Sequence, residues 1–75
     1  MKAYKLYDEQ EEQYVDGIET FDAIQEYLAE EWEDDLYPAT DMYAELHAEI
    51  YAAESVEKLQ VYADGLGYTI EEVNE

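Results

Sequence analysis

The stretch TFDAIQEYLAEEWEDD, residues 20–35, decides the fold. Its large apolar residues recur at helical spacing and so form one face of a helix: Phe21, Ile24, Leu28 and Trp32. Thr20 stands where a side-chain oxygen can accept a hydrogen bond from the first turn. We therefore expect a helix that begins after Thr20, ends near Asp35 and packs this apolar face against a core.

Two further helices are expected on the C-terminal side of this stretch. Leu36, Tyr37 and Pro38 break the first helix, and a second follows at about 39–53. It would present these residues to the core: Met42 or Tyr43, Leu46, Ile50 and Ala53. Ser55 can cap a third helix, which either Gly65 or Gly67 would end. The inner face of that helix would consist of Val56, Leu59, Ala63 and Leu66.

Strands are expected at both ends of the chain. Residues 3–8 alternate in polarity, and residues 13–18 are a second candidate, so DEQEE would be a charged hairpin loop between them. In the tail, Thr69 and Glu72 fit a helical capping box, whereas Tyr68 and Ile70 alternate as in an edge strand. The strand is favoured. The prediction is an α+β fold: a small N-terminal antiparallel hairpin, three helices and a short C-terminal strand, in a single compact acidic domain covering residues 1–75.

The charge balance indicates the kind of partner. Twenty-two Asp and Glu face three lysines, for a net charge of −19, and arginine is absent. Disorder is disfavoured because 48% of the residues are hydrophobic. An acidic exterior repels nucleic acid and anionic membranes, which predicts a basic protein as partner. The first ten residues lack the apolar stretch of a secretion signal, so a cytoplasmic location is expected.

Carboxylates form rows along the first two predicted helices. Consecutive members lie four residues apart, or ~6 Å along a helix axis, comparable with the spacing of phosphates along one DNA strand. The first row is Asp22, Glu26, Glu30 and Asp34, the second is Asp41, Glu45 and Glu49, and Glu31 and Asp35 form a parallel pair beside the first. Glu33 is the remaining carboxylate of the EEWEDD run. Like charges at this spacing oppose helix formation, as do anions in the last turn. We therefore interpret EEWEDD, residues 30–35, as functional at a cost to stability, and all ten carboxylates as candidate partner-binding residues.

Aromatic side chains are the second part of the predicted binding surface, because their rings stack on arginine. Tyr27 and Tyr37 are the candidates for orienting the partner. Tyr51 and Trp32 are further candidates, although Trp32 also continues the apolar face of the first helix. Tyr4 and Tyr43 are assigned to the core.

Catalysis is not expected from this composition. His47 is the only histidine, and no serine or cysteine is placed with it in a recognisable nucleophile arrangement. The residues DEQEEQYVDG do not follow the order of a calcium-binding loop, and the glycine loops that bind phosphate are missing. We expect no enzymatic activity, no cofactor and no metal site.

In size, acidity, lack of arginine, carboxylate rows and interleaved aromatics, the chain resembles the small DNA-mimic inhibitors of host defence that phages and mobile elements encode, of the anti-CRISPR or anti-restriction type. The resemblance implies a stoichiometric inhibitor in the host cytoplasm that occupies the basic DNA- or RNA-binding site of a bacterial defence nuclease complex or CRISPR effector. Three alternatives remain open: an immunity protein or antitoxin that neutralises a cognate nuclease, an inhibitor of a DNA-repair glycosylase, and an acidic protein of a salt-rich cell.

Overall fold

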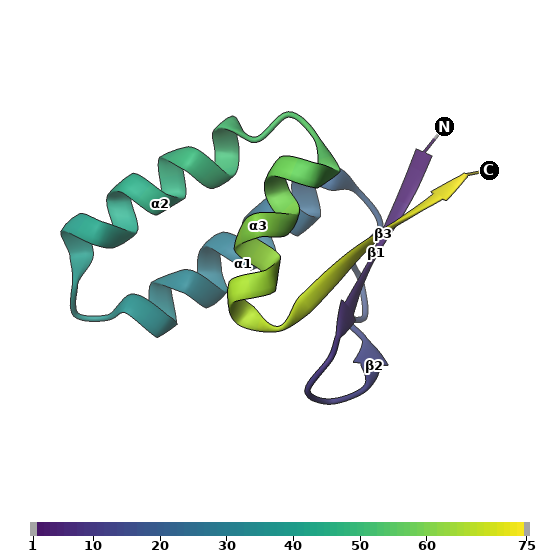
Figure 1. Cartoon of the computed structure of the whole chain (residues 1–75), viewed down its shortest axis with the longest axis horizontal. Coiled ribbons are helices and arrows are strands. Elements are labelled where there is room, and N and C mark those ends of the chain that lie inside the picture. Colours follow the sequence, from purple (N-terminus) through teal and green to yellow (C-terminus); the bar gives the residue numbers. More distant parts are fainter. Residues whose placement is uncertain (1, 75) are drawn as a thin grey trace.

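Three helices and a three-stranded sheet form the part of the chain that the computed structural model describes, residues 2–74. The elements in chain order are β1 (Lys2–Asp8), β2 (Gln13–Tyr14), α1 (Phe21–Leu36), α2 (Thr40–Ala52), α3 (Val56–Leu66) and β3 (Tyr68–Asn74). The predicted α+β class is confirmed. Figure 1 shows the sheet at one end of the molecule and the α1–α2 helix pair extending away from it.

The sheet is antiparallel throughout, in the order β2-β1-β3. The C-terminal strand is thus confirmed, and its register places Ile70 opposite Leu6, two buried residues. The second strand is much shorter than the predicted 13–18. Asp16 and Gly17 form a turn in which Gly17 has φ +81°, so residues 15–19 leave the ladder and return to β1 through single backbone hydrogen bonds.

Side-chain caps mark the starts of α1 and α3, and a glycine marks the end of α3. The Thr20 hydroxyl accepts a hydrogen bond from the Ala23 N–H at 3.1 Å, and the Ser55 hydroxyl accepts one from the Lys58 N–H at 3.3 Å. Gly67 follows α3 in the left-handed conformation, with φ +85°, and Gly65 lies inside the helix. These contacts satisfy backbone groups that a helix end leaves unpaired.

The core lies where the sheet meets the helices. Its fully buried large side chains are Leu6, Ile24, Leu28, Ile50 and Leu59. Within α2 only Ile50 is buried, because this helix packs mainly on α1. Met42 is 61% exposed, so of the two residues considered for the start of α2 it is Tyr43 that turns inward, to a half-buried position.

Two glutamines on helices form hydrogen bonds that join neighbouring elements. Gln25, which is buried, donates through its amide to the carbonyl oxygens of Ile50 and Ala53, both at 3.2 Å, at the C-terminal end of α2. Gln60 donates to the Tyr68 carbonyl at 3.0 Å and accepts from the Ile70 N–H at 2.8 Å. The Gln60 amide therefore pairs with the outer edge of β3 as a neighbouring strand would.

A candidate protein-binding surface on α1 and α2

All ten predicted carboxylates lie on α1 and α2, and neither helix contains a lysine or arginine. Nine of them are exposed, and Glu31 is half-buried. The two helices run antiparallel beside each other (Figure 1), since the Gln25 hydrogen bonds join the first half of α1 to the last turn of α2. The helix pair therefore presents only negative charge to solvent.

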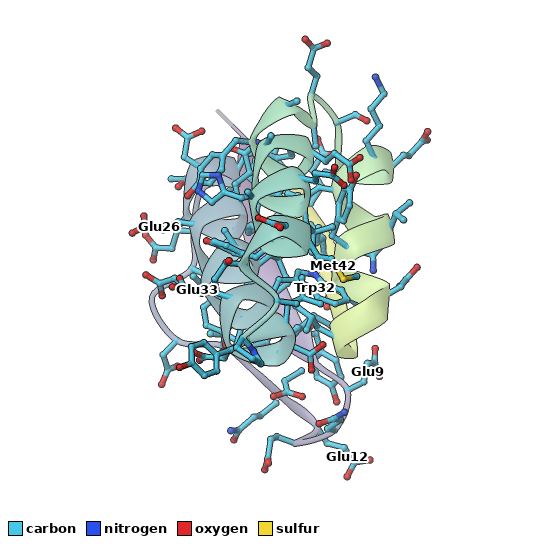
Figure 2. The ribbon with its side chains drawn as sticks, turned by 90° about the vertical axis from the view of Figure 1, so that its left-hand side faces the viewer. Glu9, Glu12, Glu26, Trp32, Glu33 and Met42 are labelled. Atoms are coloured by element: carbon cyan, nitrogen blue, oxygen red, sulfur yellow. The ribbon has the colours of Figure 1, made fainter. Side chains whose placement is uncertain are left out.

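Trp32 divides the EEWEDD run between two sides of α1. Its ring lies half-buried, and its Nε1–H donates to the Tyr62 carbonyl of α3 at 3.0 Å. Figure 2 shows Glu26 and Glu33 projecting from the side of α1 that faces away from α3. In contrast, three acids near the C-terminus of α1 line a shallow hollow of about 440 Å³ beside α3 and β3: Glu31, Asp34 and Asp35.

The carboxylate row of α2 faces a different direction from Tyr43. At 3.6 residues per turn, Glu45 lies on the side of the helix nearly opposite to Tyr43. Glu49 continues that row toward α3, where its Oε2 accepts a hydrogen bond from the Tyr62 hydroxyl at 3.2 Å. Partial burial, followed by this bond to an anion, raises the pKa of Tyr62. The α2 row therefore approaches α3, whereas Glu26 of the α1 row projects from the opposite side of the helix pair. Asp34, at the end of the α1 row, turns toward α3.

The two tyrosines predicted to orient the partner differ in exposure. Tyr27 is half-buried, its ring packs edge-on against Tyr68 at 5.5 Å between centroids, and the two hydroxyl oxygens lie 3.1 Å apart. Burial and this hydroxyl contact raise the pKa of Tyr27. Tyr37 is 78% exposed in the connection between α1 and α2. Tyr27 thus attaches α1 to β3, and Tyr37 is the one of the two whose ring is open to a partner.

An aromatic row on α2 was missed by the sequence reasoning. The rings of Tyr43, His47 and Tyr51 contact one another at successive turns, edge-on in the first pair with centroids 5.5 Å apart and tilted in the second with centroids 4.6 Å apart. Partial burial, followed by the charge of Glu33, raises the pKa of Tyr43. The four-residue spacing is visible in the sequence, but the sequence pattern assigns Tyr43 to the core and gives Tyr51 as a separate binding candidate.

Other kinds of site find little support in residues 2–74. No cluster of three or more histidine, aspartate or glutamate side chains in this range is arranged to hold a metal ion. None of the helices described is both long and apolar enough to cross a membrane. The buried side-chain nitrogen and oxygen atoms of the same residues all have hydrogen-bond partners.

Comparison with protein-family models, with curated proteins and with solved structures finds no match for this chain. Its function is therefore inferred from its own residues and their arrangement.

Proposed function

We propose that the protein is a stoichiometric inhibitor that imitates DNA and occupies the basic nucleic-acid-binding site of a host defence nuclease or CRISPR effector. One observation carries the proposal: ten carboxylates lie on two adjacent helices that contain no lysine or arginine, and nine of the ten are exposed. An ordinary solvated helix face mixes charges of both signs, because opposite charges one turn apart stabilise the helix.

The quantity of charge matches the length of DNA that the molecule would replace. The longest dimension of the chain is 39 Å. Duplex DNA carries about one charge per 1.7 Å of axis, or roughly 23 charges over such a length. The net charge of the chain is −19. A basic channel that accepts a short duplex therefore meets a comparable total charge in this protein.

The arrangement also carries an energetic cost. Six like-charge pairs lie four residues apart on α1 and α2: Asp22–Glu26, Glu26–Glu30, Glu30–Asp34, Glu31–Asp35, Asp41–Glu45 and Glu45–Glu49. Each such pair destabilises a helix by ~0.2–0.5 kcal/mol, so together they oppose folding by roughly 1–3 kcal/mol. This is a substantial part of the stability of a small domain. Binding to a basic partner explains why the chain keeps these like-charge pairs despite their cost.

The mechanism follows from the charges. Lysines and arginines that normally contact phosphates pair with the carboxylates of α1 and α2, and the occupied channel excludes DNA. Long-range attraction makes association fast, and added salt weakens it steeply. The protein itself has no affinity for nucleic acid, because the two polyanions repel.

The first test captures and identifies the target. Immobilised protein is incubated with a bacterial lysate at low salt, and bound proteins are eluted with duplex DNA. The proposal expects a nuclease among the eluted proteins whose activity falls to zero at one equivalent of inhibitor. A captured protein that duplex DNA does not release, or a released nuclease that retains full activity with excess inhibitor, would contradict it.

The second test assigns the surface with matched charge changes. Reversal of Glu30, Glu33 and Asp34 to lysine should abolish inhibition, since it places three cations on α1. The control reverses Glu11, Glu12 and Asp16, which are exposed on the sheet side of the molecule, and changes the net charge equally. Figure 2 shows Glu12 at the far end of the molecule from Glu26. Equal loss of inhibition in both variants would mean that net charge acts without a defined surface.

A further inference from the structure

The aromatic row of α2 and the carboxylates beside it form a surface with a more specific chemistry than negative charge alone. This surface consists of the rings of Tyr43, His47 and Tyr51, bordered by Glu30 and Glu33 of α1. His47 is exposed, Tyr51 is 45% exposed and Tyr43 is half-buried. The antiparallel pairing of α1 with α2, fixed by the Gln25 hydrogen bonds to Ile50 and Ala53, sets Glu33 and Glu30 level with the first two rings of the row. The charges of both carboxylates also contribute to the raised pKa of Tyr43. The rings and anions are therefore open to the same ligand.

Such a surface distinguishes two cations that simple charge mimicry would treat alike. An arginine guanidinium is planar, stacks on aromatic faces and pairs with a carboxylate through two parallel hydrogen bonds. A lysine ammonium is compact and strongly hydrated, and it gains less from a ring face. A row of rings beside carboxylates thus favours arginine, whereas isolated carboxylates on a solvated helix attract both.

The spacing of the row is close to that of alternate side chains in an extended peptide segment. The ring centroids are 5.5 Å apart in the first pair and 4.6 Å in the second. Alternate residues of an extended chain, which point to the same side, are ~6.6–6.8 Å apart. Long arginine side chains span this difference, so arginines at every second position of an extended segment can meet successive rings of the row.

We propose that Tyr43, His47 and Tyr51, together with Glu30 and Glu33, form a subsite that selects an arginine-rich segment of the partner over a lysine-rich one. This inference rests on the proposed function and specifies which part of a basic partner contacts α2. Charge decides against a second copy of this chain as the occupant. It has no arginine, and each copy carries −19.

The test compares two peptides of equal charge, octa-arginine and octa-lysine, in calorimetric titrations at low salt. The wild-type protein should bind octa-arginine about tenfold more tightly, because guanidinium groups gain more from ring faces than ammonium groups do. Replacing His47 and Tyr51 with alanine should reduce the preference to about twofold, chiefly by weakening octa-arginine binding. Both side chains are exposed at the surface, and the fold is verified by circular dichroism.

The control variant replaces Gln13 and Tyr14, two exposed residues of β2, with alanine and should keep the full preference. Equal binding of the two peptides by the wild type, or an unchanged preference after loss of His47 and Tyr51, would overturn the subsite. The wider proposal would survive that result if the reversal of Glu30, Glu33 and Asp34 still abolished binding of both peptides. Failure of both peptides to bind the wild type at low salt would overturn the subsite and the proposed function together.

Discussion

Replacing Asp34 and Asp35 with lysine should stabilise the fold while weakening its attachment to a basic partner. Both residues lie in the last turns of α1, where the backbone carbonyls already present partial negative charge and no basic residue offsets it. Each also follows another carboxylate by one turn, Glu30 and Glu31 respectively. The substitution thus changes two unfavourable interactions at each position into favourable ones.

The expected magnitude can be worked from these contacts. A charge near a helix terminus contributes about 0.3–1 kcal/mol, and each pair one turn apart contributes about 0.2–0.5 kcal/mol of either sign. Lysine placed four residues after glutamate is also the better orientation of such a pair. The helix-end effect and the pair effect act on the same charges and do not add fully, so we expect a gain of about 2 kcal/mol in the free energy of unfolding. For a domain of this size, that corresponds to a rise in Tm of roughly 8–16 °C.

Thermal unfolding followed by circular dichroism measures the effect at low salt and at about 1 M NaCl, where the Debye length falls to about 3 Å and the gain should shrink. A matched variant with lysine at Glu12 and Asp16, exposed residues on either side of β2, makes the same change in charge outside any helix. It should change the free energy of unfolding by no more than about 0.5 kcal/mol. An unchanged or lower Tm for the Asp34 and Asp35 variant would refute the view that these carboxylates cost stability.

Three further predictions concern packing and ionisation. Gly65→Ala would place its Cβ 2.7 Å from the Trp32 ring. We expect the free energy of unfolding, measured with urea, to fall by about 1–3 kcal/mol. Unchanged fluorescence from this single tryptophan would contradict the packing. Gln25→Leu leaves buried carbonyls of α2 without their donor, at a cost of about 2 kcal/mol; a stability equal to wild type would show that those carbonyls find other partners. The raised pKa of Tyr27 means that the fold favours the neutral phenol, so this contribution is complete below the ordinary pKa of 10.0 and is lost as the pH rises above it. Tm should fall more steeply above that pH for the wild type than for Tyr27→Phe, and parallel curves would refute the assignment.

The fold could be predicted from sequence wherever a local signal decides the structure. The caps at Thr20 and Ser55, the helix end at Gly67 and the apolar face of α1 act within one or two turns, and all appear as expected. The second strand could not be predicted, since its length depends on how the turn at Gly17 meets β1. This contact is made only after the chain has folded.

The sequence predicts which residues form the candidate site, but not the side of the helix pair on which each carboxylate row lies. Exposure of nine carboxylates follows from the apolar faces of α1 and α2. Which flank each row occupies depends on the rotation of one helix against the other, to which Gln25 contributes through its hydrogen bonds to α2. In the sequence, Gln25 and Gln60 resemble exposed helix residues, because glutamine is a good helix former. Their hydrogen bonds to other elements become visible only with the tertiary contacts. The row of Tyr43, His47 and Tyr51 is different, because its four-residue spacing lies within one helix and is visible in the sequence.

Competition between duplex DNA and this protein for the captured nuclease tests the proposed DNA mimicry directly. Labelled duplex DNA is titrated with the nuclease at several fixed concentrations of the protein. If the carboxylates of α1 and α2 stand in for phosphates, the apparent Kd for DNA should rise in proportion to protein concentration, and no complex should contain both. A complex that holds nuclease, DNA and this protein together, with an unchanged Kd for DNA, would contradict it.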